Sequence, residues 1–359
     1  MAKVQERQFQ MIGLIPKIAG YNLFREFGAG RPLPANITVT VTDVCNFMCK
    51  TCNIGKLYLA HPEMAKNELT ADEYGKIFSN LGNVFWVTVT GGEPFFRRDL
   101  VDVVSDIYRA SRPMFMTLPT NGYVPKKIAS DVERILDECE GMRVMVNLSL
   151  DGVEKEHDEI RGMDGSFKRL LESYSALRML DDSRLSIGVN TVISKFNVGM
   201  MDEICAFVRG ELKPDSFIAE VAENRSNLYN ENDDMRPKDY NAALKNLMLQ
   251  DRNPKKLPLI LIKLARNAFY RTLASGKAHR CFAGFASACI MPKGDLWLSC
   301  VKNSAVGNLR DADYDFRRLW FSKKAMSMRK ELKKPCGCML ANAHYTNLMC
   351  NPFQLLSVR

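Results

Sequence analysis

The alternation of strand and helix patterns between residues 36 and 223 constrains the fold of this chain most strongly. A short β-branched run, a turn with polar or glycine residues and a helical pattern follow one another six times. The helical patterns have ordinary start signals, such as the capping box that Thr70 and Glu73 can form. Each unit takes about 31 residues, the usual size of a βα repeat. The predicted strands are 37–42, 85–90, 114–120, 143–150, 184–193 and 216–222.

This repeat predicts an α/β fold built on a parallel sheet. Six right-handed βα units make a partial (β/α)6 TIM-like barrel, whereas a closed barrel has eight. The missing units leave a lateral gap through which a large substrate could enter. We expect functional side chains at the carboxyl ends of the strands.

The chain is expected to have four regions. Residues 1–35 form an N-terminal amphipathic segment, 36–223 the partial barrel and 224–279 a connector with helices. Residues 280–359 form a small loop-rich extension that contains six of the 11 cysteines. This extension has too little regular apolar pattern for a core of its own, so we expect bound metal to stabilise it.

The charge of the chain limits its partners only weakly. A net charge of +9, from 50 Lys and Arg against 41 Asp and Glu, favours anionic partners without naming one. Nucleic acid is not expected, because no basic run is interleaved with stacking aromatic residues. The N-terminus shows no export signal, so we expect a cytoplasmic protein whose cysteines bind metal as thiolates.

The N-terminal segment suggests two alternatives. Residues 11–28 are apolar but are interrupted by charges and a proline, so they cannot span a bilayer. The segment would suit peripheral contact with an anionic membrane surface, or it forms a helix packed on the barrel. Its charged residues are Lys3, Arg7, Lys17, Arg25 and Arg31 against Glu6 and Glu26.

A cysteine-rich loop directly follows the first predicted strand. Cys45, Cys49 and Cys52 have Cys-x3-Cys-x2-Cys spacing. Three thiolates on one tight loop can bind three irons of a 4Fe–4S cubane and leave the fourth iron open to a small chelating molecule. The alternatives are a structural zinc site or an electron-transfer cluster, although both usually have four protein ligands.

A second motif, Gly91-Gly92-Glu93-Pro94, ends the second predicted strand. Glycine lets a backbone approach a ligand closely. Together with the cysteine loop, this motif resembles the radical S-adenosylmethionine (AdoMet) superfamily. The resemblance implies that AdoMet binds the open iron and that Gly91, Gly92 and Glu93 receive its methionine amino group.

Further positions match the superfamily in the expected order. Asn121 follows the third predicted strand, and Ser149 ends the fourth. The resemblance implies that Ser149 and Asn190 face the ribose and carboxylate of AdoMet and that Val192 frames the adenine with Ala222. The segment from His157 to Gly162 also resembles the superfamily branch with auxiliary clusters, with His157 in a structural role.

The C-terminal cysteines resemble the SPASM and twitch extensions, which hold auxiliary 4Fe–4S clusters. Two departures stand out: five residues separate Gly294 from Cys300 where four are usual, and the later pair is Cys-x-Cys. The resemblance therefore implies one auxiliary cluster, with zinc as the alternative. The preferred ligands are Cys281, Cys300, Cys336 and Cys338, with Cys289 and Cys350 as substitutes.

The resemblance implies an oxidoreductase or maturase-type enzyme that forms a 5′-deoxyadenosyl radical and abstracts hydrogen from its substrate. We expect oxidative modification of a peptide or protein, with a flavodoxin or ferredoxin as the reducing partner. One alternative is modification of a glycan, lipid or other anionic small metabolite; another is a non-catalytic iron–sulfur electron-transfer protein or a zinc protein. Glu220 and Glu223, at the end of the sixth predicted strand, are candidates for facing the substrate.

Overall fold

The computed structural model describes residues 14–223, 235–237, 239–249, 257–276, 278–299 and 304–351. The strands of these residues form one nine-stranded sheet with the order β6-β5-β4-β3-β2-β1-β7-β8-β9. The six predicted strands are confirmed as β1–β6, all parallel to their neighbours, and the sheet does not close into a barrel. Their bounds are β1 Asn36–Thr40, β2 Trp86–Thr90, β3 Phe115–Thr120, β4 Arg143–Ser149, β5 Leu185–Ile193 and β6 Ser216–Val221.

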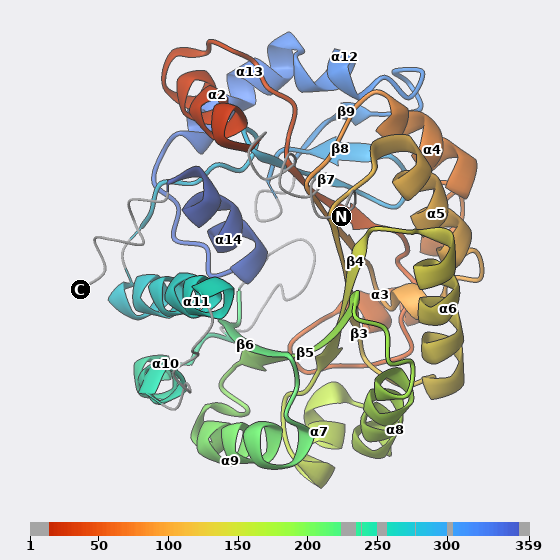
Figure 1. Ribbon diagram of the computed structural model, residues 1–359, viewed down its shortest axis with the longest axis vertical. Helices are drawn as coiled ribbons and strands as arrows, with labels where there is room; N and C mark the ends of the chain where they lie inside the picture. Colours follow the sequence, from red (N-terminus) through yellow and green to blue (C-terminus); the bar gives the residue numbers. More distant parts are fainter. Residues whose placement is uncertain are drawn as a thin grey trace.

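Helices follow the strands of the barrel in the predicted alternation. Figure 1 shows α4, α5, α6 and α8 outside the curved sheet, where their apolar faces meet the buried side of the strands. The capping box of α4 is confirmed, since Thr70 accepts from the Glu73 N–H and Glu73 accepts from the Thr70 N–H. These helices are α3 Ile54–Ala60, α4 Ala71–Ser79, α5 Leu100–Ser111, α6 Pro125–Glu138, α7 Glu154–Arg161, α8 Ser166–Arg178 and α9 Met201–Phe207.

The C-terminal region extends the same sheet. Strand β7 (Ser287–Ile290) pairs in parallel with β1, and the antiparallel strands β8 (Asp295–Trp297) and β9 (Ala305–Asn308) follow it. The loop-rich extension therefore grows from the edge of the barrel beside the strand that leads into the cysteine loop. Its helices are α12 Phe316–Trp320, α13 Lys323–Leu332 and α14 Ala341–Cys350, and α10 Tyr240–Leu249 and α11 Leu257–Ser275 precede it.

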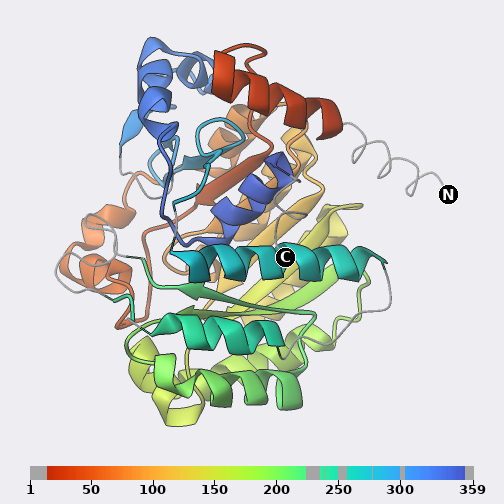
Figure 2. The same cartoon turned by 90° about the vertical axis from the view of Figure 1, so that its left-hand side faces the viewer.

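Helix α14 lies against the polar inner face of the sheet. Asn36 Nδ2 on β1 donates to Asn342 Oδ1 (2.6 Å) and to Thr346 Oγ1 (2.8 Å), both on α14. Asn36 stands at the start of β1, so α14 covers the amino-terminal end of this face. In Figure 2 the dark blue α14 and the teal α11 lie in front of the strands. The cysteine loop begins at the opposite, carboxyl end of the strands, beyond the part of the face that α14 covers.

The N-terminal helix α2 (Leu14–Phe27) packs on the C-terminal region, next to α12 and α13 in Figure 1. Arg25 is buried and donates to the backbone carbonyls of Cys281 (2.9 Å) and Lys333 (2.8 Å). Arg25 is therefore not free to meet an anionic surface, and the membrane hypothesis gains no support from it. Lys3 and Arg7 lie outside the described residues. Among the described helices, none has the length and apolar character that a membrane crossing needs.

Candidate functional site

The cysteine loop leaves the carboxyl end of β1 and returns into α3. The Cys52 N–H donates to the Cys49 carbonyl at 3.2 Å, which closes a tight turn. The sulfurs of Cys45 and Cys52 accept the backbone N–H groups of Phe47 and Ile54. Burial raises the pKa of Cys45 to about 11 and that of Cys52 to about 12. A bound cation would therefore stabilise the thiolate form of these cysteines.

The Gly91–Gly92 turn lies directly on this loop. The Gly92 N–H donates to the Thr42 carbonyl and the Glu93 N–H to the Val44 carbonyl, both at 2.8 Å. A Cβ at Gly92 would lie 2.2 Å from the Val44 oxygen and 3.0 Å from Cys45 Cβ. The glycine is therefore required by the contact between two backbone segments, a reason that the sequence did not disclose.

Glu93 organises the carboxyl ends of β2 and β3. Its buried carboxyl group accepts from Thr120 Oγ1 (2.8 Å), the Phe95 N–H (3.1 Å) and the Asn121 N–H (2.7 Å). Burial raises its pKa to about 7, against the opposing effect of these hydrogen bonds. The side chain of Glu93 thus fixes the loops around the site, and its backbone contacts the cysteine loop.

The other predicted AdoMet residues lie along the ends of β3, β4 and β5. Asn121 Nδ2 donates to Asn46 Oδ1 of the cysteine loop at 2.9 Å, whereas Asn46 Nδ2 is buried and has no partner among the described residues. Ser149 lies beside Asn190 in the register of β4 and β5, and Asn190 Oδ1 is likewise buried and unpartnered. Val192 donates its N–H to Asp151 Oδ1 at 2.8 Å. Unsatisfied buried amide groups of this kind suit a polar ligand.

Arg161, which sequence reasoning did not single out, supports the cysteine loop from α7. It forms an ion pair with Asp151 at 3.0 Å, with side chains 13 % and 1 % exposed. Its charge lowers the pKa of Cys49 and Cys45, in opposition to burial. The adjoining Ile160 carbonyl accepts the Lys50 N–H at 2.8 Å. The sequence pointed to Arg161 only through the segment from His157 to Gly162, and it did not indicate that this segment packs against the cysteine loop.

His157 itself is fully buried. Its Nδ1 accepts the Asp151 N–H at 3.2 Å, and burial lowers its pKa to about 3. The imidazole is therefore neutral and forms part of the support for Asp151.

We expect Arg161→Met to lower the free energy of unfolding by about 3–5 kcal/mol, because it leaves Asp151 buried without its partner charge. The change should also slow iron loading of the cysteine loop, since a positive charge that favours thiolates is lost. Chemical denaturation of the metal-free protein and iron uptake followed by absorbance measure the two effects. Arg161→Lys, which keeps the charge, should restore much of the uptake rate; equal uptake by Met and Lys variants would contradict the electrostatic role.

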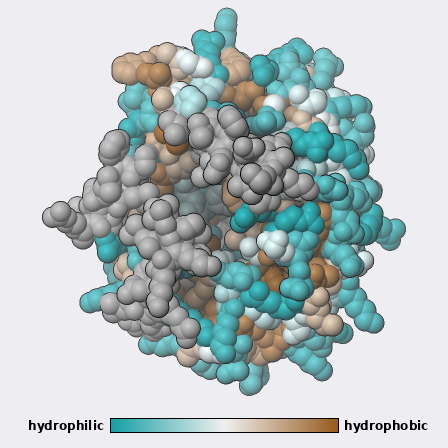
Figure 3. Space-filling view, in the orientation of Figure 1, coloured by the Kyte–Doolittle hydropathy of each residue, from teal (hydrophilic) through white to brown (hydrophobic). Residues whose placement is uncertain are grey.

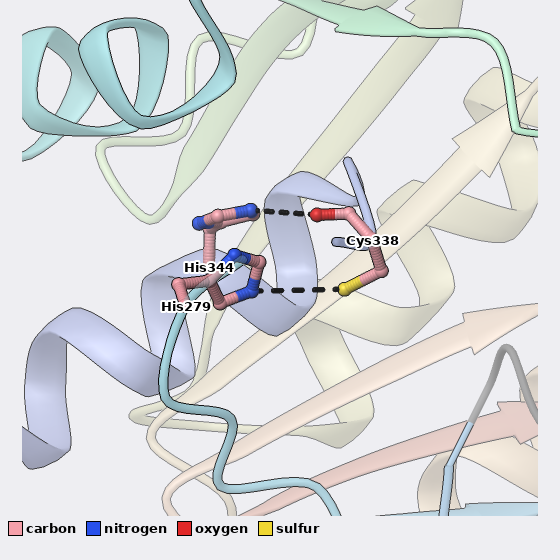
Figure 4. A group of neighbouring side chains, drawn as sticks. All are labelled: His279, Cys338 and His344. Atoms are coloured by element: carbon pink, nitrogen blue, oxygen red, sulfur yellow. Dashed lines mark hydrogen bonds between the residues drawn. The ribbon is translucent and has the colours of Figure 1, made fainter. Parts of the chain in front are cut away.

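A second cluster of side chains of the types that can bind metal lies in the C-terminal region. Three of the predicted ligands, Cys281, Cys336 and Cys338, interact through their thiols, and the ligand atoms of His279, Cys338 and His344 all lie within 4.8 Å of one another. Thiol donation from Cys281 and Cys338 lowers the pKa of Cys336, and the same contacts raise the pKa of Cys338. Figure 4 shows two histidines beside Cys338, His279 and His344, which sequence reasoning missed.

The remaining C-terminal cysteines are placed differently. Cys300 lies outside the described residues. Cys289 is buried on β7 between Thr38 of β1 and Trp297 of β8. Cys350 ends α14, where burial raises its pKa and its carbonyl accepts from Asn22 Nδ2 at 2.9 Å.

The two glutamates at the end of β6 have different surroundings. Glu223 accepts the Met339 N–H and forms an ion pair with Arg236 at 3.4 Å. It thus ties the barrel edge to the residue that follows Cys338. Glu220 is half-buried and lies opposite Val192 in the register of β5 and β6.

Known proteins resemble the barrel part of this chain. Residues 39–208 match the model of the radical SAM superfamily. GTP 3′,8-cyclase of Edwardsiella ictaluri is 33% identical over 178 residues, which are 48% of this chain and 51% of that protein. The probable GTP 3′,8-cyclase of Saccharolobus islandicus is 30% identical over 186 residues, 50% of this chain and 53% of that protein. The chain thus spans about half the length of the curated relatives it matches.

Solved structures match the fold over a larger share of the chain. Native anSMEcpe with bound AdoMet superposes with a TM-score of 0.60 at 15% identity and covers 90% of this chain and 99% of that one. Streptococcus suis SuiB bound to precursor peptide SuiA gives a TM-score of 0.60 at 18% identity, over 88% and 73% of the two chains. The partial barrel is therefore shared with these proteins. Residues 39–208 are thus similar to the radical SAM superfamily, whose enzymes use a 4Fe–4S cluster and AdoMet.

Proposed function

We propose that this chain cleaves AdoMet reductively and uses the resulting radical for oxidative modification of a peptide or protein. The observation that carries the proposal is the contact of the Gly91–Gly92 backbone with the loop of Cys45, Cys49 and Cys52. This contact sets a three-thiol loop beside a turn without side chains at the carboxyl end of the sheet. When bound, a 4Fe–4S cluster with AdoMet supplies an electron and a 5′-deoxyadenosyl radical that abstracts hydrogen from an unactivated carbon.

The residues of the site fit such a group. Cys45, Cys49 and Cys52 would hold the cluster, and the backbone of Gly91, Gly92 and Glu93 would meet the methionine part of AdoMet. Asn121, Ser149, Asn190 and Val192 would orient the rest of AdoMet. The unpartnered amide atoms of Asn46 and Asn190 favour this assignment, because a bound polar molecule would satisfy them.

The peptide substrate is supported by the extent of the fold match. SuiB was solved with a precursor peptide, and its superposition covers 88% of this chain. A second structure of anSMEcpe was solved with AdoMet and the Cp18Cys peptide, and its superposition covers 90% of this chain. The view in Figure 3 shows a hollow near the centre of this face, with both polar and apolar residues around it. Under this proposal residues 280–359 are a SPASM- or twitch-like domain beside the barrel of residues 36–223. A flavodoxin or ferredoxin would supply the electron.

A small anionic metabolite is the second candidate substrate. It is favoured by the curated relatives, which are named GTP 3′,8-cyclases and match about half of this chain. The net charge of +9 would suit a nucleotide as well as an acidic peptide.

One assay tests the activity and separates the two substrates. Anaerobically reconstituted protein with dithionite should convert AdoMet to equal amounts of methionine and 5′-deoxyadenosine. A cysteine-containing peptide should raise the yield and lose two hydrogens in its mass spectrum. A response to GTP and none to the peptide would favour the second candidate. A protein with a complete cluster that leaves AdoMet intact would reject the proposed activity.

A further inference from the structure

The second cysteine cluster is built from two short stretches that face each other. His279 and Cys336 form an antiparallel β-bridge: the His279 N–H donates to the Cys336 carbonyl at 2.8 Å, and the Cys336 N–H to the His279 carbonyl at 2.9 Å. Side chains directly opposite each other in such a pair point to the same face. Cys281 and Cys338 each follow their bridge residue by two positions, and in extended chain such residues share its face. Two sequence pairs, His-x-Cys and Cys-x-Cys, thus deliver four metal-binding side chains to one point.

The spacing of these side chains is that of ligands to a single ion. His279 Nε2 lies 3.9 Å from Cys338 Sγ, and the ligand atoms of His279, Cys338 and His344 all lie within 4.8 Å of one another. In a tetrahedral zinc site with Zn–S of about 2.3 Å and Zn–N of about 2.0–2.1 Å, neighbouring ligand atoms stand about 3.5–3.8 Å apart. The thiols of a cubane stand farther apart, since each binds a different iron.

His344 contacts both His279 and Cys338. Its ring lies against that of His279 with centroids 4.1 Å apart, and its Nε2–H donates to the Cys338 carbonyl at 2.9 Å. Both imidazoles are buried beside Cys338. The three residues that Figure 4 shows, His279, Cys338 and His344, also border a cavity of about 180 Å³.

We propose that Cys281, Cys336, Cys338 and His279 bind one zinc ion in a tetrahedral Cys3His site, with His344 as a positioning residue. The site replaces the auxiliary cubane expected from Cys281, Cys300, Cys336 and Cys338. Zinc fits because three thiolates and one imidazole are a common ligand set of structural zinc. The ion joins residues 279–281 to 336–338, across the strands and helices of the C-terminal region, and so stabilises that region. The proposal is independent of radical chemistry at the first loop.

The test uses the full chain with Cys45, Cys49 and Cys52 changed to Ala, purified without oxygen. We expect one zinc per chain, and X-ray absorption at the zinc edge should show three sulfur neighbours and one nitrogen. Iron in this variant, with the spectrum of a 4Fe–4S cluster, would overturn the proposal. Because the first loop cannot bind a cluster here, the result does not depend on AdoMet cleavage.

Single substitutions in the wild-type chain identify the ligands. His279→Cys should keep the zinc and change the spectrum to four sulfurs, whereas His279→Ala should release zinc faster to a chelator. His344→Ala should keep three sulfurs and one nitrogen. Cys205→Ala removes a buried thiol of α9, which is distant in sequence from the proposed ligands, and should leave the zinc content unchanged. An unchanged nitrogen contribution in His279→Cys would exclude His279 as a ligand.

Discussion

Replacing Cys45, Cys49 and Cys52 together by Ala should reduce AdoMet cleavage to the background measured without protein. The three thiols are the only protein ligands that the proposed cluster has at this loop, and the open iron depends on all of them. Each single substitution should cost nearly as much as the triple one, because residues that act as a unit are not additive. Chromatographic measurement of 5′-deoxyadenosine, with dithionite as reductant, gives the result.

Cys139→Ala provides the matched control for these thiols. Cys139 is buried at the end of α6, and its pKa is raised by burial like those of the loop cysteines. Removing it should cost some stability through lost packing and leave cleavage per folded molecule intact. Cleavage by the triple variant at the wild-type rate would refute the assignment of the first site.

The barrel could be predicted because its signals are local. The run 143–150 is bounded by turns and is typical of a buried strand, and β4 (Arg143–Ser149) occupies all but its last residue. The cysteine loop and the Gly91–Gly92 turn follow adjacent strands, so parallel pairing alone brings them to one edge of the sheet. For this part of the chain, sequence order and spatial order coincide.

The C-terminal region could not be predicted in the same way, because its contacts are distant in sequence. Strand β7 has only four residues, too few for a period, and its partner β1 lies some 250 positions earlier along the chain. His279 and His344 come together only once α14 is seated on the sheet. A histidine without a neighbouring ligand carries no metal signal, whereas the His279-x-Cys281 spacing could have suggested the first pair.

The structure gives a different reason for glycine at position 92, and this changes the expected effect of mutating it. In the sequence, Gly92 reads as a residue that makes room for AdoMet. In the fold, its missing side chain makes room for Val44 and Cys45, on the loop that would hold the cluster. A Cβ at 2.2 Å from a backbone oxygen cannot be accommodated by a side-chain rotation, so one of the two backbone segments must move.

Gly92→Ala should therefore lower both the iron content of the reconstituted protein and its AdoMet affinity, and cleavage should fall by about 100-fold or more if the ligands shift by 1 Å. Gly199→Ala is the matched control, since no atom lies within 4 Å of the added Cβ and its φ is not positive. It should retain wild-type iron and cleavage. The decisive measurement is iron per folded chain alongside AdoMet binding. Weakened AdoMet binding with a full cluster would mean that Gly92 serves the ligand alone, and that the cysteine loop tolerates the displacement.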